Sequence, residues 1–340
     1  MNRPFPRLGL DILYFSGLHL LARPLLGGVG AILSFNRVRP PRPEAFQPNR
    51  RLEVTPGFLE RVVRRLRRAR VDLVSLDALH QRLSEGDFRR RFVCVTFDGG
   101  YRDTAEHAAP ILRRYDVPFA LFVPTSFPDR LGELWWVALE RVVAENNRIA
   151  LLMNGREQRF HCRTLREKHE SFAAIRSRLW ELLSDEEMRV VVRDLSGRYA
   201  VDLRAICAEL CMSWNEIAEL ARDPLVTIGA QTVNHVALAK MSEEAVRSEM
   251  TMSRAVIESA LGVRPQHFAY PFGGARAAGA REFRIAAELG FKTAVTTQPG
   301  VVSRRHPAHL MSLPRFVLDG DYQRLRFVKV LLSGAATGFR

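Results

Sequence analysis

The chain has 340 residues, of which 47% are hydrophobic, and this is enough for one large α/β domain or two small ones. Its net charge of +14 comes almost entirely from arginine, and a positive surface of this kind would attract an anionic membrane leaflet, an acidic glycan or nucleic acid. The four cysteines form no Cys-x-x-Cys pair, which excludes a disulfide-rich scaffold and argues against a structural zinc site.

An apolar stretch near the amino terminus, 8–33, raises the question of export or membrane insertion. Charged residues interrupt this stretch, a proline and two glycines break it, and no small-x-small cleavage motif follows. We therefore expect a helix over 10–22, within a segment 1–27 that packs on or beside the main domain, and a strand over 29–35. The apolar face of this helix could also lie on a membrane surface. Without an export signal, we expect the chain in the cytoplasm or at the inner membrane face.

From there on, strands and helices alternate, as in a parallel sheet with crossover helices. We expect helices over 58–70, 104–114, 242–261 and 280–289, and strands over 71–76, 93–98, 119–123, 225–229, 268–274 and 291–296. Between 124 and 223 the pattern changes to charged stretches with helical periodicity, which we interpret as a helical insertion. The sequence thus predicts a single α/β domain over 1–340 with this insertion and a C-terminal helix within 320–340.

One predicted strand ends on an acidic residue. The apolar run 93–97 stops at Asp98, which two glycines follow. In α/β barrels the loops after the carboxyl ends of the strands build the active site, and glycines let the backbone turn sharply there. A structural alternative is that Asp98 caps the next helix, but Asp103 suits that role better, because with Glu106 it matches a capping box. We therefore expect Asp98 to carry chemistry.

Three strand ends carry motifs that can meet at one site. They are Asp98-Gly99-Gly100-Tyr101, Gln231-Thr232-Val233-Asn234-His235 and Tyr270-Pro271-Phe272-Gly273. In order and in context they resemble the first three motifs of the polysaccharide deacetylase family, also called carbohydrate esterase family 4. The resemblance extends from about residue 30 to residue 315. It implies a deformed or incomplete (β/α) barrel and metal-assisted hydrolysis of an N-acetyl group on an amino sugar.

The resemblance also implies roles for individual residues. Asp98 would be the general base, and His235 would be one of two histidine metal ligands. Gln231 stands at the position of the other histidine. The backbone N–H of Tyr270 would stabilise the oxyanion of the tetrahedral intermediate. His309 is the candidate general acid near the carboxyl end of the motif region.

Further residues are expected to contact the substrate. They are Tyr101, Pro271, Phe272, Arg315 and Trp135. Trp135 is a candidate because aromatic faces pack against the apolar faces of pyranose rings, although the Trp135-Trp136 pair could instead anchor the insertion. Arg315 lies at or near the place where the family commonly has a histidine as general acid, and an arginine cannot donate a proton at neutral pH.

The implied chemistry requires a divalent metal, zinc or a similar ion. Such an ion polarises the amide carbonyl and lowers the pKa of bound water, while a carboxylate accepts the proton and an N–H stabilises the oxyanion. Two positions depart from the family pattern. Gly99 replaces an aspartate ligand and Gln231 replaces a histidine ligand, and neither side chain is a good donor for zinc.

These departures leave two functions open. The first is an N-deacetylase, a hydrolase of carbon–nitrogen amide bonds, acting on an oligosaccharide, a glycolipid or an exopolysaccharide precursor. The second is a catalytically impaired relative that binds such a glycan without hydrolysis. A nucleic-acid binder is a third alternative, based on the arginine-rich segment 61–70. No helix-turn-helix or aromatic-basic platform accompanies that segment, so we do not expect a nucleic-acid partner.

Overall fold

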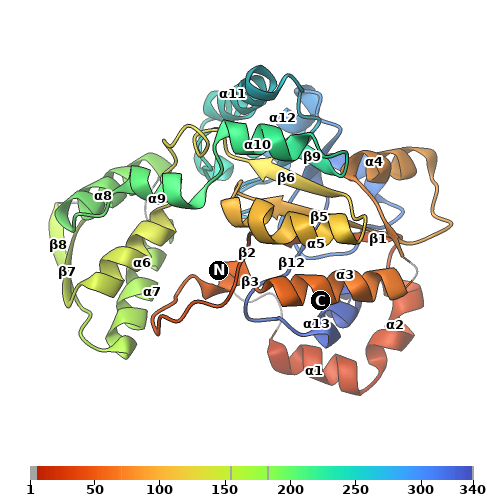
Figure 1. Cartoon of the computed structure of the whole chain (residues 1–340), viewed down its shortest axis with the longest axis horizontal. Coiled ribbons are helices and arrows are strands. Elements are labelled where there is room, and N and C mark those ends of the chain that lie inside the picture. Colours follow the sequence, from red (N-terminus) through yellow and green to blue (C-terminus); the bar gives the residue numbers. More distant parts are fainter. Residues whose placement is uncertain (1–5, 70, 154, 182–183, 339–340) are drawn as a thin grey trace.

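The computed structural model describes residues 6–69, 71–153, 155–181 and 184–338. Its centre is a parallel sheet with the strand order β11-β10-β9-β6-β5-β1-β12, and β4 pairs beside β5 (Figure 1). The strands are β1 (Gly30–Phe35), β4 (Asp72–Leu73), β5 (Phe92–Asp98), β6 (Phe119–Val123), β9 (Val226–Ala230), β10 (His267–Ala269), β11 (Thr293–Val295) and β12 (Phe316–Val317). Each lies within or next to an apolar run of the sequence.

The two edges of this sheet approach each other. Leu313, just before β12, forms a parallel bridge with Val295 at the end of β11. The sheet therefore curls into an incomplete barrel, which confirms the predicted fold class. Because the strands are parallel, their carboxyl ends all meet at one rim, where the loops of an α/β barrel build its site.

Helices cover the outside of the sheet (Figure 1). They are α3 (Pro56–Arg68), α4 (Leu76–Glu85), α5 (Ala109–Arg114), α10 (Trp214–Ala221), α11 (Glu243–Leu261) and α12 (Ala280–Glu288). Local sequence explains their ends: the Thr55 hydroxyl accepts a hydrogen bond from the N–H of Phe58 at the start of α3, and Ser242 caps α11. The helices predicted over 242–261 and 280–289 are confirmed, and the one predicted over 58–70 is confirmed as far as Arg68; residue 70 lies outside the described residues.

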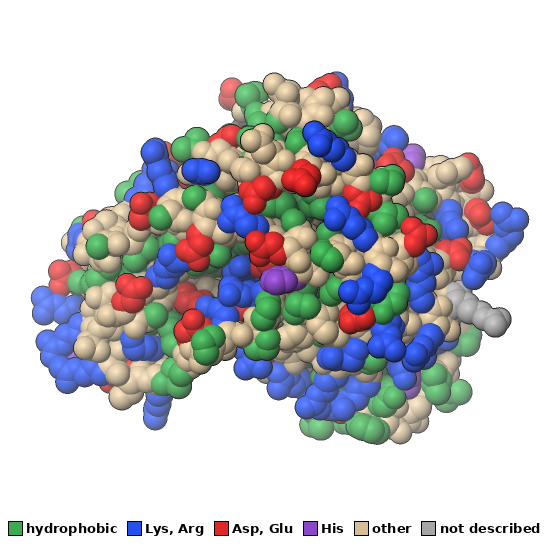
Figure 2. Space-filling model, in the orientation of Figure 1, with side chains coloured by type: hydrophobic (Ala, Val, Ile, Leu, Met, Phe, Trp, Pro, Cys, Tyr) green, Lys and Arg blue, Asp and Glu red, His purple; other side chains and the backbone are tan. Residues whose placement is uncertain are grey.

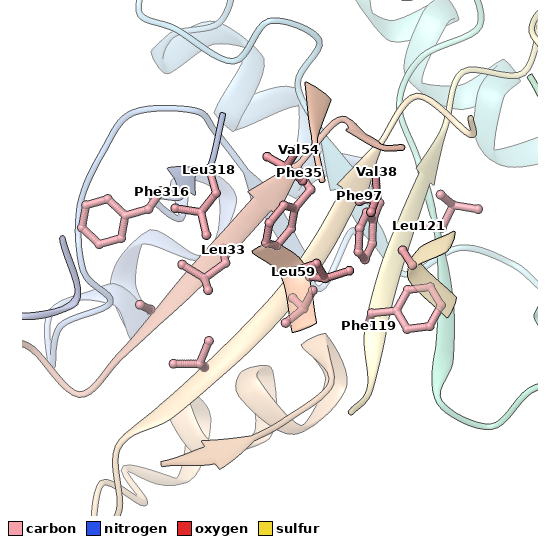
Figure 3. Packing of buried hydrophobic residues seen from close by; sticks show 14 of the residues in the cluster. Leu33, Phe35, Val38, Val54, Leu59, Phe97, Phe119, Leu121, Phe316 and Leu318 are labelled. Carbon is pink, nitrogen blue, oxygen red and sulfur yellow. The ribbon is translucent and has the colours of Figure 1, made fainter. Parts of the chain in front are cut away.

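The main core lies between the sheet and the helices packed on it (Figure 3). Phe35 of β1 stacks on Phe97 of β5 at 5.4 Å between ring centroids, and Phe119 of β6 meets Phe97 edge-on at 5.5 Å. Leu59 of α3 is fully buried in the same cluster. Aromatic pairs of this kind add to the free energy gained by burial, and they fix the relative positions of the strands that reach the rim.

The segment 124–223, apart from α10, forms a second packed unit beside the barrel (Figure 1). It contains α6 (Trp135–Glu145), α7 (Leu165–Glu181), α8 (Asp185–Arg198) and α9 (Leu203–Leu210), and a hairpin of β7 (Arg148–Met153) and β8 (Arg156–His161). The helices agree with the predicted periodic stretches. The hairpin was not predicted, because β8 exposes most of its side chains and its composition does not distinguish it from a charged loop.

The predicted helix over 10–22 is wrong in its boundaries. The chain forms two helices, α1 (Arg7–Phe15) and α2 (Leu18–Leu26), because Gly17 adopts a left-handed conformation with φ 74° between them. They pack against the C-terminal helices α13 (Leu325–Leu332) and α14 (Ala335–Gly338). Within the described ranges, we find no helix with the length and apolar character needed to cross a bilayer.

Asp103 does not cap the helix that follows β5. That helix begins with a π-helical turn, Thr104–Ala108, and Asp103 makes no capping hydrogen bond. Its carboxylate instead pairs with the Arg37 guanidinium at 2.7 Å and accepts a hydrogen bond from the N–H of Val38 at 3.3 Å. Asp103 therefore joins the segment after β1 to the segment after β5, beside the rim of the sheet.

Candidate active site

A cavity of about 210 Å³ lies at the carboxyl ends of the strands, between the sheet and the segment 124–223. Six of the predicted site residues line it: Asp98, Tyr101, Trp135, Gln231, His235 and Phe272. The residues after β5, β9 and β10 therefore contribute to one cavity, as the sequence motifs predicted. Trp136 and Trp180, which come from α6 and α7, supply further aromatic surface.

Asp98 is held by a buried arginine. Both of its carboxylate oxygens lie 2.7 Å from guanidinium nitrogens of Arg315, which is fully buried. The same guanidinium donates to the Thr96 hydroxyl at 3.0 Å and to the Thr296 carbonyl at 2.8 Å. A planar, bidentate pair of this kind fixes the carboxylate in one orientation and compensates its charge. Arg315 thus positions Asp98.

The two residues that depart from the family pattern contact each other. The backbone N–H of Gly99 donates to Oε1 of Gln231 at 3.0 Å, and Gln231 is 1% exposed. Gly99 has a φ of 98°, and a Cβ built there would lie 2.7 Å from a ring carbon of Tyr101. An aspartate would therefore be strained at position 99, and Tyr101 would have to move to admit it.

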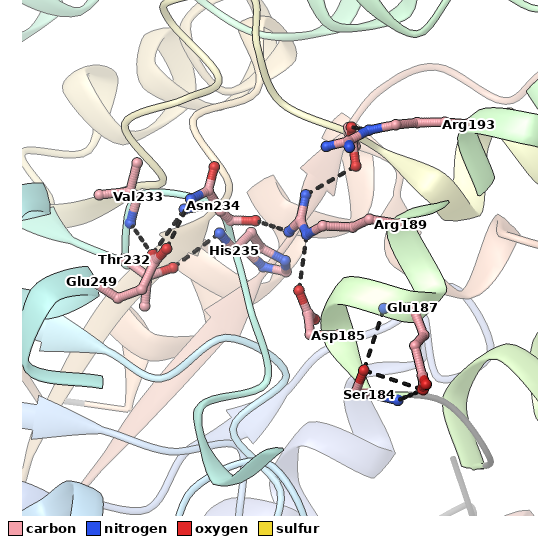
Figure 4. Close-up of polar contacts among 11 residues, drawn as sticks. Ser184, Asp185, Glu187, Arg189, Arg193, Thr232, Val233, Asn234, His235 and Glu249 are labelled. Carbon is pink, nitrogen blue, oxygen red and sulfur yellow. Dashed lines mark hydrogen bonds and ion pairs between the residues drawn. The ribbon is translucent and has the colours of Figure 1, made fainter. Parts of the chain in front are cut away.

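The loop that carries His235 is tied to two other elements (Figure 4). On one side, the Glu249 carboxylate of α11 accepts hydrogen bonds from the backbone N–H groups of Val233 and Asn234, at 2.7 and 3.0 Å. On the other side, Arg189 of α8 donates to the Asn234 carbonyl at 2.6 Å and also pairs with Asp185. The His235 loop is therefore fixed to the barrel and to the segment 124–223 at once.

His235 faces a largely aromatic environment. Its ring centroid lies 4.8 Å from that of Phe272, 5.4 Å from that of Trp136 and 5.8 Å from that of Phe127. Nδ1 is buried and has no hydrogen-bond partner among the residues that the structure describes. Desolvation by these rings lowers the pKa of His235 to about 3, so the imidazole is neutral at physiological pH. Its free nitrogen can accept a hydrogen bond from a ligand.

Backbone strain is concentrated at this rim. Among the described residues, six non-glycine residues have positive φ, and three of these are Thr232, His235 and Phe272, with φ of 65°, 54° and 60°. Left-handed backbone costs free energy for residues with a Cβ, and such conformations cluster at ligand-binding and catalytic sites. The strain therefore supports a functional role for the loops after β9 and β10.

The residues present do not fit the divalent metal that the family resemblance implies. Across residues 6–69, 71–153, 155–181 and 184–338, no three His, Cys, Asp or Glu side chains lie close enough together to hold a metal ion. An ion bound to Asp98 would also face the Arg315 guanidinium, which already occupies both carboxylate oxygens. Of the expected ligands only His235 offers a free donor atom, and we derive no catalytic step through a metal.

Four predicted site residues do not line the cavity. The N–H of Tyr270 donates to the Val295 carbonyl in the sheet at 3.2 Å, so it is not available to an oxyanion. Pro271 is buried in the turn after β10, and His309 is exposed outside the cavity. Arg315 contacts Asp98 instead of the substrate space. These assignments from the sequence are therefore wrong in their geometry.

A second carboxylate at the cavity, that of Asp319, was not among the residues predicted from the sequence. This residue follows β12, and its Oδ2 lies 3.8 Å from Nη2 of Arg51, which also lines the cavity. Burial raises the pKa of Asp319 to about 6. The pattern that marked Asp98, an apolar run that ends on an aspartate before a glycine, also occurs at 316–320 and could have identified it.

Comparisons with solved structures show the same fold. The chain is similar to the deacetylase PplD from Streptococcus pyogenes, with a TM-score of 0.59 and 18% identity over 88% of this chain and 97% of that one. IcaB from Ammonifex degensii gives a TM-score of 0.54 and 17% identity, covering 89% and 97% of the two chains. A de-N-acetylase from Aggregatibacter actinomycetemcomitans gives a TM-score of 0.56 and 12% identity, covering 88% and 99%.

At the level of sequence, the search of curated proteins returned no match for this chain. The family model described as polysaccharide deacetylase matches residues 85–151 and 179–294, which together are more than half of the 340 residues. These ranges include Asp98, Gln231, His235 and Phe272. The chain therefore belongs to the polysaccharide deacetylase family, whose reaction is the hydrolysis of a carbon–nitrogen amide bond.

Proposed function

We propose that the cavity binds an N-acetylated amino sugar, as part of an oligosaccharide, a glycolipid or an exopolysaccharide precursor, and that it does so without metal-assisted hydrolysis. Family membership supports the class of ligand. The lining supports it too, because Trp136, Trp180 and Phe272 offer flat apolar surfaces to a pyranose ring and its methyl group. The His235 nitrogen can accept a hydrogen bond from the amide N–H of such a group.

The observation that carries this proposal is the pairing of Asp98 with Arg315. A base for a metal-bound water needs a carboxylate that is free to accept a proton and close to the ion. Here both carboxylate oxygens of Asp98 lie 2.7 Å from the buried Arg315 guanidinium. Gly99 and Gln231 stand at the positions of two of the family's metal ligands, and they are hydrogen-bonded to each other instead. These contacts favour binding over metal-assisted chemistry.

Deacetylation is the second candidate function. Family membership favours it, and so does Asp319, a cavity carboxylate whose pKa of about 6 suits a general base near neutral pH. In this case Asp319 would accept a proton from the attacking water, and Asp98 would keep its structural pair with Arg315. This route differs from the role that the family resemblance implied for Asp98.

One set of measurements distinguishes the two functions. Binding of N-acetylglucosamine oligomers would be measured by calorimetry, and acetate release would be followed with and without added zinc, cobalt or magnesium. Trp180→Ala removes an aromatic wall and should weaken binding at least about tenfold. Trp214→Ala is the matched control, since Trp214 lies outside the cavity lining and bonds to Asp129.

Binding without acetate release supports the first function. Release that Asp319→Asn abolishes and that metals do not change supports the second function. Metal-dependent release that Asp98→Asn abolishes, in a variant that still melts cooperatively, contradicts both accounts of the site. Failure of every oligomer to bind overturns the proposed class of ligand.

A further inference from the structure

The first two helices carry an apolar surface that is open to solvent. Seven of the thirteen large hydrophobic side chains exposed among the described residues lie on α1 and α2, with exposed fractions from 43% to 87%. They are Leu8, Ile12, Phe15, Leu18, Leu20, Leu21 and Leu25. We call this set the N-terminal apolar surface. Contiguous exposed apolar surface commonly marks a protein or membrane interaction site.

Helical spacing arranges these side chains in stripes. On α1 the exposed residues are four and three positions apart, and on α2 Leu18, Leu21 and Leu25 are three and four positions apart, so each set follows one face of its helix. The other sides of these helices are already used, because Leu10 is buried on the opposite face of α1, and His19 and Ala22 are buried beside the exposed stripe of α2. Folding therefore leaves each helix with a second, uncovered apolar stripe.

Basic side chains without acidic partners lie next to this surface. Helix α3 packs on α13, which packs on α1, and it exposes four arginines that pair with no carboxylate of the described residues. These are Arg61, Arg64, Arg65 and Arg68. Figure 2 shows Lys and Arg side chains gathered over this region, above hydrophobic side chains at the lower edge of the molecule. Arg23 adds a further exposed cation on α2 itself.

We propose that α1 and α2 lie on the surface of an anionic lipid bilayer. The N-terminal apolar surface enters the boundary between headgroups and acyl chains, and the α3 arginines face the lipid phosphates. Short amphipathic helices with leucine and phenylalanine on one face and adjacent cations bind membranes in this way. A second copy of the chain fits less well, because a two-fold interface through this surface would bring like-charged arginine clusters together. The proposal does not depend on the function of the cavity.

The test is co-sedimentation of the full chain with vesicles of phosphatidylcholine alone or of an equal mixture with phosphatidylglycerol. We expect binding to the anionic vesicles that weakens as salt is raised. Leu21→Glu with Leu25→Glu, at side chains 74% and 87% exposed, should reduce binding at least about tenfold. Arg64→Gln with Arg65→Gln should reduce it about fivefold for each arginine.

The matched control is Leu131→Glu with Val263→Glu, at side chains that are 58% and 67% exposed outside the N-terminal apolar surface. This control should bind like the wild type. Equal binding by the leucine variant and the control would overturn the proposal, as would absence of binding to anionic vesicles. A dimer in sedimentation velocity that the leucine variant alone converts to monomer, without vesicle binding, would assign the surface to a second copy and would also overturn it.

Discussion

At the scale of single residues, the cavity depends on a charge in the protein interior. Arg315 has no exposed surface, and its guanidinium is satisfied by the Asp98 carboxylate, the Thr96 hydroxyl and the Thr296 carbonyl. A buried cation of this kind is tolerated only because every contact is made. The pair therefore holds β5 and the segment before β12 together at the rim. Removal of one partner would leave the other as an unpaired buried charge and would lower the free energy of unfolding.

Arg315→Met leaves the buried Asp98 carboxylate without its partner. We expect the free energy of unfolding to fall by about 3–5 kcal/mol, measured by urea denaturation. The double variant Asp98→Asn with Arg315→Met removes both charges and should recover a large part of this loss. Equal stability of the single variant and the wild type would show that the pair does not stabilise the rim.

Asp319 gives the stability a specific pH dependence. Its pKa is raised from 3.8 to about 6 by burial, so the folded state holds the proton more tightly than the unfolded chain. Stability from this group is fully present below its unfolded pKa and is lost as pH rises through about 6. Asp319→Asn should therefore gain stability relative to the wild type as pH increases across this window, measured by denaturation at a series of pH values.

Glu216→Gln is the control with the opposite sign. The Arg102 guanidinium lowers the pKa of Glu216 from 4.5 to about 2, so the stability it contributes is present above 4.5 and lost as pH falls towards 2. Its variant should therefore differ most from the wild type above pH 4.5 and converge with it in acid. If both variants follow the wild-type pH curve, neither carboxyl group behaves as the geometry indicates.

At the scale of elements, α8 determines the position of the loop after β9. Arg189 is the connection: it contacts Glu133 and Asp185 within the segment 124–223 and the Asn234 carbonyl in the loop (Figure 4). Its side chain is only 17% exposed, so these contacts are poorly screened by water. The place of His235 in the cavity thus depends on a helix that comes before it in the chain and belongs to another packed unit.

Arg189→Met should release this loop. We expect a loss of about 2 kcal/mol in the free energy of unfolding and faster hydrogen exchange at the backbone amides of 231–235. Arg193→Met is the matched control, because Arg193 is 60% exposed and also pairs with Glu133, but does not contact the loop. Its effect should stay within about 1 kcal/mol. Identical exchange in both variants would contradict the role of Arg189.

The sequence predicted the helices and strands that have a clear local pattern of apolar or capping residues. Buried parallel strands are continuous apolar runs, so β1, β5, β6 and β9 could be predicted, and capping residues marked α3 and α11. The break at Gly17 was less apparent, since a glycine within an apolar stretch also fits a single helix. The β7–β8 hairpin was not predicted, because it is held by backbone pairing between its two strands and its sequence has no clear hydrophobic pattern of a strand.

The site was harder to predict than the fold. Asp98 and His235 both line the cavity, and the sequence indicated their proximity because parallel strands end at a common rim. The partner of Asp98 could not be found in the same way: Arg315 lies 217 positions further along the chain, and their contact depends on how the sheet curls. The roles assigned to Tyr270 and His309 came from motif position alone, and hydrogen bonding and exposure contradict them.

At the scale of the whole molecule, the described residues form two larger packed cores on either side of the cavity, besides a smaller hydrophobic cluster that contains Ile32 and Phe92. One lies between the sheet and its helices, and the other fills the segment 124–223, where Ile175 and Leu179 are fully buried. Each core can lose stability without direct loss in the other, because few of their residues are in contact. Residues from both units line the cavity, so local unfolding of the less stable unit is enough to disrupt it.

Ile175→Ala and Ile257→Ala are matched variants that test whether the two cores lose stability independently. Both side chains are fully buried, one in each core, and each change should cost about 2–5 kcal/mol locally. Hydrogen exchange should show Ile175→Ala accelerating amides in α7 and α8 while β5 stays protected, and Ile257→Ala doing the reverse. Uniform acceleration across the chain in both variants would mean that the molecule unfolds as one cooperative unit.

The path of the chain into and out of the segment 124–223 has a further consequence. The chain leaves the sheet at the end of β6 and returns through β9, and these strands are hydrogen-bonded neighbours with five registered pairs. One continuous stretch of polypeptide can therefore be exchanged for another, longer or shorter, while the strand order stays as it is. Such an exchange would replace the aromatic side chains that this segment contributes to the cavity, Trp136 and Trp180 among them, and would therefore change which ligand binds. Ligand preference can thus change in this fold while the sheet is retained.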